Sequence, residues 1–133
     1  MAKTYISRGR DRSKFAVTEN INIDNGAATA ADYLLLVPDK DIIIESARII
    51  YTQATDTAGA ASANVKIGTS AGGAEIVAAT AMAVSKAVGS YTDLVLTSAT
   101  RVPANGMLIV RHTGIAATEG GEYKVQVRYR FVG

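Results

Sequence analysis

The chain has 133 residues, with 14 basic and 12 acidic side chains and a formal net charge of +2. It contains no cysteine, which excludes disulfides, thiolate metal sites and cysteine nucleophiles. No segment approaches the roughly 20 apolar residues of a membrane span, and no apolar run follows the cationic N-terminus, so we expect a soluble protein made in the cytoplasm.

Positive charge is concentrated at the two ends of the chain. Residues 1–14 carry five basic side chains against one acidic, whereas residues 15–121 carry six basic and ten acidic. The first segment is polar and has no hydrophobic period, which predicts an extended N-terminal arm over residues 1–14 and a single domain over residues 15–133. The basic residues of the arm are Lys3, Arg8, Arg10, Arg12 and Lys14.

Three interpretations of the arm are open. It can dock on an acidic protein surface or a neighbouring subunit, remain a solvated tail, or contact nucleic-acid phosphates. Only Tyr5 and Phe15 lie near the basic residues, and proteins that bind single-stranded nucleic acid normally use aromatic stacking platforms. Contact with nucleic acid is therefore the least favoured of the three interpretations.

The first half of the domain has the pattern of successive short strands. Residues 33–37 form a short apolar run, and residues 42–53 form the longest β-branched stretch. Neither face of this long stretch is purely apolar, which predicts a bulge or a change of partner midway. Residues 15–23 alternate weakly and place five side chains on one predicted face: Phe15, Val17, Glu19, Ile21 and Ile23.

Residues 75–88 fit either a strand or a helix. Their alanine content favours a helix, but their position between strand signals and the lack of strong capping residues favour a strand. Residues 91–97 and 107–112 alternate as strands do, and the Asn-Gly pair within residues 103–106 is a strong signal for a chain reversal.

The final segment, residues 122–131, alternates strictly between polar and apolar side chains. Its apolar members must share one face of a strand. The opposite face carries a basic row made of Lys124, Arg128 and Arg130. This row either faces solvent or binds acidic residues of a partner.

The chain thus contains about eight predicted strands at intervals of roughly 10 to 15 residues. This spacing is typical of an antiparallel sandwich or barrel. The predicted fold is all-β: an antiparallel β-sandwich of about eight strands, jelly-roll-like, with an extended basic N-terminal arm.

The sequence offers no recognisable catalytic apparatus. His112 is the single histidine, and no nucleophile-elbow pattern surrounds any serine. Asp39, Asp41 and Glu45 are close in sequence but lack the spacing of a calcium loop. The glycine-rich residues 68–73 lack the Gly-Lys-Ser/Thr ending of a phosphate loop. We therefore expect a protein that is not an enzyme and that uses no cofactor or metal.

The order of these segments resembles the small head decoration, or cement, proteins of tailed bacteriophages. The likeness covers most of residues 15–133: a Val-Pro boundary, a long Ile-rich strand, an Ala/Gly/Thr-rich middle and the sequence Thr-Asp-Leu-Val-Leu-Thr follow the basic arm. Its most specific parts are Val-Pro-Ala-Asn-Gly at residues 102–106 and the closing strand.

This resemblance implies a jelly-roll-like sandwich, commonly trimeric, seated on the outside of the capsid lattice. It implies contacts with the major capsid protein and reinforcement of the shell, and therefore a location on the virion exterior after synthesis in the host cytoplasm. By position and charge, residues 3–14 would make the capsid or neighbour contacts.

Two other functions are open. The same sandwich could serve as a tail, fibre or head-completion subunit of a phage. It could also be a carbohydrate-binding module, with Tyr33, Tyr51 and Tyr91 as stacking faces, although the chain has no tryptophan.

Overall fold

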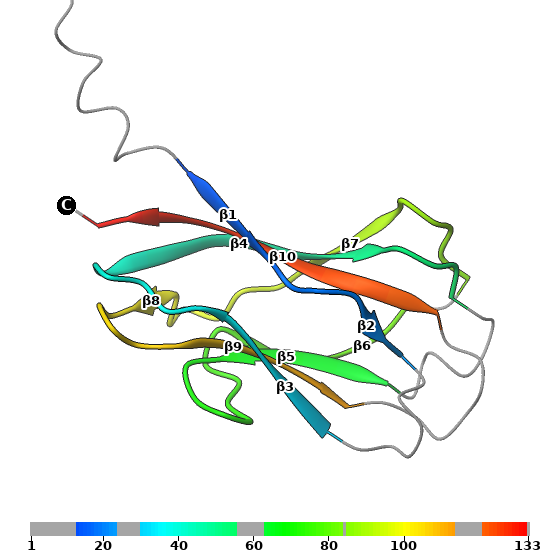
Figure 1. Ribbon diagram of the computed structural model, residues 1–133, viewed down its shortest axis with the longest axis horizontal. Coiled ribbons are helices and arrows are strands. Elements are labelled where there is room, and N and C mark those ends of the chain that lie inside the picture. The colour runs from blue at the N-terminus through cyan, green and yellow to red at the C-terminus, as the bar shows by residue number, and fades with distance from the viewer. Residues whose placement is uncertain (1–12, 24–29, 56–62, 84, 114–120, 133) are drawn as a thin grey trace, which may run out of the picture.

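The computed structural model describes residues 13–23, 30–55, 63–83, 85–113 and 121–132. Within these ranges the chain is all-β, with two antiparallel sheets that face one another as layers (Figure 1). The strands are β1 (Lys14–Val17), β2 (Ile21–Asn22), β3 (Ala30–Leu36), β4 (Ile42–Tyr51), β5 (Asn64–Gly68), β6 (Val77–Ala81), β7 (Tyr91–Leu94), β8 (Arg101–Val102), β9 (Leu108–Thr113) and β10 (Glu122–Phe131).

The strand order is that of a jelly roll. The larger sheet has the order β1-β10-β4-β7, with the two-residue strands β2 and β8 paired to β10 and β4, and the smaller sheet has the order β3-β9-β5-β6. Without β2 and β8, eight strands remain, four in each sheet, and the chain crosses repeatedly from one sheet to the other. The predicted jelly-roll-like sandwich is confirmed.

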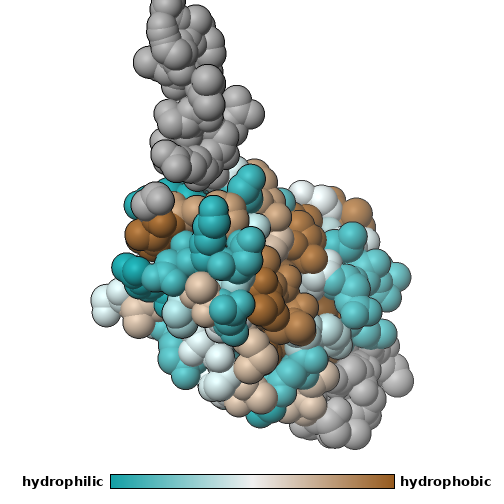
Figure 2. All heavy atoms as spheres, turned by 60° about the vertical axis from the view of Figure 1, so that its left-hand side comes forward, coloured by the Kyte–Doolittle hydropathy of each residue, from teal (hydrophilic) through white to brown (hydrophobic). Residues whose placement is uncertain are grey.

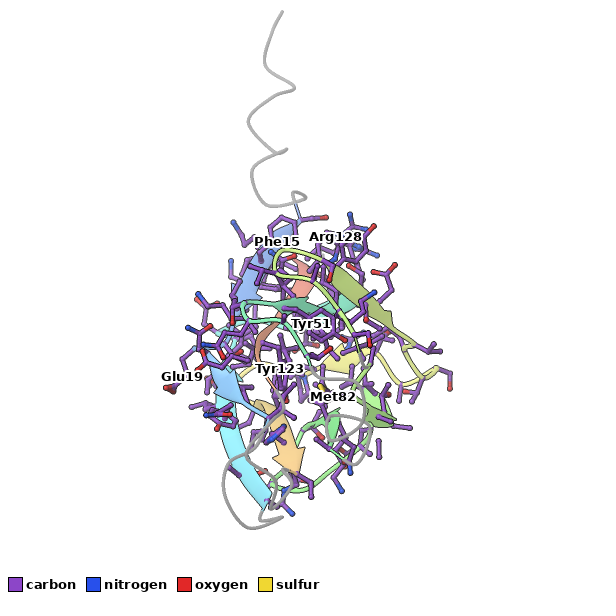
Figure 3. All side chains as sticks on the ribbon, turned by 90° about the vertical axis from the view of Figure 1, so that its right-hand side faces the viewer. Phe15, Glu19, Tyr51, Met82, Tyr123 and Arg128 are labelled. Atoms are coloured by element: carbon purple, nitrogen blue, oxygen red, sulfur yellow. The ribbon has the colours of Figure 1, made fainter. Side chains whose placement is uncertain are left out.

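The core lies between the sheets, and β10 and β4, the two central strands of the larger sheet, contribute many of its side chains. The alternation of β10 buries Tyr123, Val125, Val127 and Tyr129 and turns its polar side chains outward, as the sequence predicts. Figure 3 shows Tyr51 and Tyr123 in the interior, whereas Phe15 and Arg128 lie together at the outside of the larger sheet.

A bulge in β4 explains why neither of its predicted faces is purely apolar. Ser46 lies opposite Arg128 and Ile44 lies opposite Tyr129, so Glu45 is the extra residue that the register shift accommodates. The inward set therefore changes phase along the strand: Ile42, Ile44, Ala47, Ile49 and Tyr51 are all buried. The predicted bulge is confirmed, and it leaves Glu45 on the outer side.

The ambiguous residues 75–88 contain a strand. Only β6 is regular, and it forms the outer strand of the smaller sheet by pairing with β5. Ile76, Val77 and Met82 are buried in the core. Beyond Met82 the chain turns, with Ser85 at φ 57° in the left-handed region.

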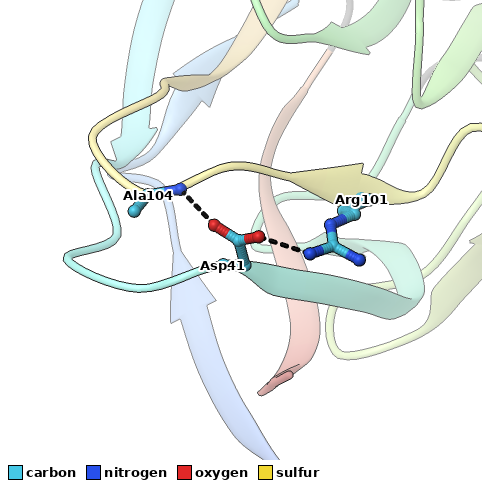
Figure 4. A network of polar contacts seen from close by, with 3 residues as sticks. All are labelled: Asp41, Arg101 and Ala104. Carbon is cyan, nitrogen blue, oxygen red and sulfur yellow. Dashed lines mark hydrogen bonds and ion pairs between the residues drawn. The ribbon is translucent and has the colours of Figure 1, made fainter. Parts of the chain in front are cut away.

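Residues 103–106 form the predicted reversal, but it joins strands of different sheets and is not a hairpin. The Gly106 N–H donates to the Pro103 carbonyl at 2.9 Å, and Asn105 has φ 63°, as position i+2 of a type II turn requires. Asp41 holds this turn from the neighbouring loop: its carboxylate pairs with Arg101 and accepts the Ala104 N–H at 2.8 Å (Figure 4).

The sequence prediction for residues 15–23 is wrong in one respect. Phe15 and Val17 are exposed, whereas Ile21 and Ile23 are buried, so these residues do not share a face. The chain breaks between β1 and β2, where the Thr18 hydroxyl accepts the Val125 N–H at 3.0 Å in place of a backbone carbonyl. This break shifts the alternation by one residue, as the register along β10 shows.

Residues 1–12 lie outside the described residues, so the extended arm stays a prediction, as does the division into an arm of residues 1–14 and a domain of residues 15–133. Lys14 belongs to β1. Residues 24–29, 56–62 and 114–120 also lie outside the described ranges.

Candidate partner-binding face

The outer side of β1 and β10 carries the described part of the predicted binding residues. We call this surface the β1–β10 face; it comprises Phe15, Val17, Glu45, Lys124, Gln126, Arg128 and Arg130. Strand alternation turns these β1 and β10 side chains outward together, and pairing places Phe15 opposite Arg128 and Val17 opposite Gln126.

Glu45 lies at the centre of the charged part of this face. Its two carboxylate oxygens lie 3.5 Å from Arg128 Nε and 3.3 Å from Arg130 Nε, and the Ser13 hydroxyl also donates to it. Ion pairs at half-exposed positions contribute little to stability. One carboxylate shared by two guanidinium groups leaves the β1–β10 face positively charged.

Lys124 adds to this charge, since the structure gives it no ion pair within the described residues. Lys14 differs from the other predicted basic residues: its ammonium lies 5.8 Å from the centre of the Phe131 ring, at the end of the sandwich. Lys3, Arg8, Arg10 and Arg12 lie outside the described residues. Thus Lys124, Arg128 and Arg130 are brought together in one row as predicted, while the arm remains to be tested.

Phe15 and Val17 are binding candidates that the sequence analysis missed. Their side chains are 59% and 47% exposed, although both residues belong to β1. The sequence gives little sign that these two side chains are exposed, because it does not reveal the break at Thr18 that separates their face from that of Ile21 and Ile23. Figure 2 shows a band of apolar side chains bordered by hydrophilic areas on the face it displays. Within the described residues the exposed large apolar side chains are Phe15, Val17, Leu34, Val37, Val88, Tyr91, Val95 and Met107.

Farther along the same sheet, Arg48 lies against two residues of β7. Its guanidinium carbon is 4.3 Å from the centre of the Tyr91 ring, and its Nε is 3.8 Å from an Asp93 oxygen. This stack occupies one face of the Tyr91 ring. Of the three tyrosines considered for sugar stacking, Tyr51 is buried, Tyr33 is half-buried in the other sheet, and Tyr91 is exposed. They therefore form no common platform.

His112 is a core residue. Its side chain is fully buried, with Nδ1 2.7 Å from the Tyr123 hydroxyl and Nε2 3.3 Å from the Ile23 carbonyl oxygen. Burial lowers the pKa of His112 below its ordinary value, because the charged form would lose its hydration. These contacts give the histidine a structural role in joining β9, β10 and the end of β2.

Two of the acidic residues named in the sequence, Asp41 and Glu45, have structural partners as well. The Arg101 guanidinium and the Ala104 N–H lower the pKa of Asp41, and Arg128 and Arg130 engage Glu45. The described part of the chain holds no group of three or more histidine or acidic side chains suited to a metal ion. It likewise holds no helix long and apolar enough to cross a bilayer.

The glycine-rich residues 68–73 begin the connection between β5 and β6, which pair with each other. The Glu75 carboxylate accepts the Thr69 N–H at 2.9 Å and so closes this loop from within. The loop is folded against Arg111, which forms a two-point ion pair with Asp32 at 2.7 and 2.8 Å. These contacts show that residues 68–73 serve to connect two paired strands.

Comparison with known proteins supplies one structural likeness. No family model and no curated protein matches this chain. A chain in the solved structure of the cyanophage Pam1 capsid asymmetric unit superposes with a TM-score of 0.56 and 16% sequence identity, covering 90% of this chain and 85% of that chain. At this identity the likeness shows that the two chains share a fold.

Proposed function

We propose that this protein is a structural component of a phage virion: a non-catalytic decoration protein that binds the outer surface of the capsid lattice and stabilises the shell. The observation that carries the proposal is the jelly-roll fold shared, over nine tenths of this chain, with a chain of a phage capsid structure. The order of sequence segments, which resembles that of decoration proteins, supports it independently.

The physical requirements of such a role match the molecule. A decoration protein needs a rigid scaffold and several weak contacts that avidity multiplies. The sandwich supplies the scaffold, and a homo-oligomer, with a trimer favoured, would supply the multiplicity. The partner is the major capsid protein, and the contacts are made by the β1–β10 face and by the basic residues of the first 14 positions.

Cosedimentation with capsids of its own phage, stripped of decoration proteins, tests this proposal. The full chain should bind, and binding should weaken steeply as ionic strength rises because exposed charges are screened. Removal of residues 1–12, and separately Arg128→Glu with Arg130→Glu, should each reduce binding. Lys66→Glu, on β5 of the other sheet, is a single charge reversal outside the β1–β10 face; it serves as the control and should bind as the unmodified chain does.

Two results would contradict parts of the proposal. A shortened chain that decorates capsids as well as the full chain would remove the arm from the interface. Labelled protein found on intact particles only at the tail or at the unique vertex would replace the decoration role with a tail, fibre or head-completion role.

A further inference from the structure

The turn at residues 103–106 presents a chemically labile pair to solvent. Asn105 is exposed, and the residue after it is Gly106, which has no side chain to hinder a reaction at its nitrogen. In such a pair the Gly106 nitrogen can lose its proton to a solvent base and attack the side-chain carbonyl carbon of Asn105. Ammonia then leaves and a cyclic imide forms. Water opens the imide at either carbonyl, which yields aspartate or isoaspartate.

The backbone conformation of Asn105 opposes this ring closure. Its φ is 63°, and at position i+2 of a type II turn ψ is about 0°. At that ψ the Gly106 nitrogen is eclipsed with the Asn105 nitrogen, whereas the ring needs the Gly106 nitrogen on the side of the Asn105 Cβ. The Cα–C bond of Asn105 must therefore rotate away from its turn value before the imide can form.

Backbone hydrogen bonds hold the two reacting residues in place. The Asn105 N–H donates to the carbonyl of the buried Pro38 at 2.7 Å. The Gly106 N–H donates to the Pro103 carbonyl at 2.9 Å, so the proton that the reacting nitrogen must lose is already bonded. Rotation of the Asn105 Cα–C bond moves the Gly106 nitrogen and breaks this second bond. Opening of the turn must therefore precede the reaction.

Asp41 supplies the side-chain contact that keeps the turn closed. Its carboxylate accepts the Ala104 N–H at 2.8 Å and pairs with Arg101 (Figure 4). Its own carbonyl accepts the Val132 N–H at 3.0 Å, which anchors it beside the end of β10. Hydrogen bonds to a charged group are stronger than those between neutral groups. The other two acceptors of the turn are backbone carbonyls, so Asp41 is the position where a substitution can remove an acceptor.

We propose that Asn105 is a gated site of covalent modification: it converts to aspartate or isoaspartate when the turn opens, and Asp41 is the positioning residue that sets how often the turn opens. Because Asn105 is exposed, solvent base and water reach it freely, and conformation is the barrier to reaction. Isoaspartate adds a carbon atom to the backbone. A turn modified in this way cannot re-form the same hydrogen bonds, so its opening becomes irreversible.

The test follows the conversion of Asn105 by mass spectrometry in the full chain, incubated at mildly alkaline pH below its melting temperature. Peptide mapping separates this conversion from that of Asn25, which also precedes a glycine. The same chain in denaturant gives the rate for a fully open turn, and the folded rate is that rate multiplied by the open fraction. The folded chain should convert Asn105 about a hundred-fold more slowly, which corresponds to about 2.8 kcal/mol.

Variants test the role of Asp41. Asp41→Ala should raise the folded rate about ten-fold. Asp41→Asn keeps a side-chain oxygen that can accept the Ala104 N–H and should raise the rate less. Asp39→Ala removes an exposed carboxylate from the same loop and is the matched control, which should leave the rate unchanged. Tyr123→Phe weakens the core at the opposite end of β10 and should also leave the rate unchanged.

Thermal unfolding shows whether each variant is folded at the temperature of the assay; if Asp41→Ala is not, Asp41→Asn takes its place in the comparison with Asp39→Ala. A folded chain that converts Asn105 as fast as the denatured chain would overturn the proposal, and so would equal rates for the Asp41 and Asp39 variants. Acceleration by Tyr123→Phe equal to that by Asp41→Ala would assign the reaction to global unfolding and would overturn the role of Asp41.

Discussion

Replacing Tyr123 by Phe removes one hydroxyl from the core and leaves a ring nitrogen of His112 without its partner. Both side chains are fully buried. His112 Nε2 faces the Ile23 carbonyl, which can only accept a hydrogen bond, so the neutral ring carries its proton on Nε2. Nδ1 is then the acceptor, and the Tyr123 hydroxyl donates to it across 2.7 Å.

The cost follows from this geometry. Leaving a buried acceptor unsatisfied destabilises a protein by about 1 to 3 kcal/mol. For a chain of 133 residues, a melting entropy of about 2.1 cal/mol/K per residue converts each kcal/mol into about 3.6 °C. Tyr123→Phe should therefore lower the melting temperature by about 4 to 11 °C.

A double-mutant cycle isolates the bond. His112→Leu should also destabilise the protein. The double variant, His112→Leu with Tyr123→Phe, should lose less stability than the sum of the two single losses, and the difference, the coupling free energy, should be about 1 kcal/mol or more. Urea unfolding at pH 8 measures each corner, provided that the denaturant slope is unchanged. Tyr129→Phe is the matched control, since the structure gives its hydroxyl no hydrogen bond within the described residues. Strict additivity in the cycle would refute the assigned bond.

Two further outcomes follow from particular groups. Because the pKa of His112 is lowered by burial, the unfolded chain takes up the proton first; stability should fall as pH drops below about 6.5, and His112→Leu should flatten that decline in unfolding measured from pH 8 to 5. Equal slopes would contradict this. Gly72→Ala should destabilise the protein more than Gly89→Ala. Both glycines have positive φ, which costs a residue with a Cβ about 1 to 2 kcal/mol. Only at Gly72 would the added Cβ also meet the Arg111 guanidinium, at 2.9 Å. Melting temperatures that rank in the opposite order would exclude this contact.

Local patterns in the sequence predict much of this fold. The strict alternation of residues 122–131 is sufficient to identify β10 and its buried face. The mixed faces of residues 42–53 predict a bulge or a change of partner midway, and the structure shows a bulge at Glu45. The Asn-Gly pair predicts the reversal at residues 103–106 because Asn tolerates positive φ. The row of Lys124, Arg128 and Arg130 follows from the same alternation.

What the sequence by itself determined is therefore the class of fold and which side chains share a face within one unbroken strand, because side-chain direction depends only on local backbone geometry. Tertiary structure alone decided the strand order, the inverted phase of Phe15 and Val17 relative to Ile21, and the burial of His112. These depend on pairing between distant segments: β1 meets β10 from the opposite end of the chain, and the Thr18 hydroxyl ends their ladder only because Val125 lies beside it.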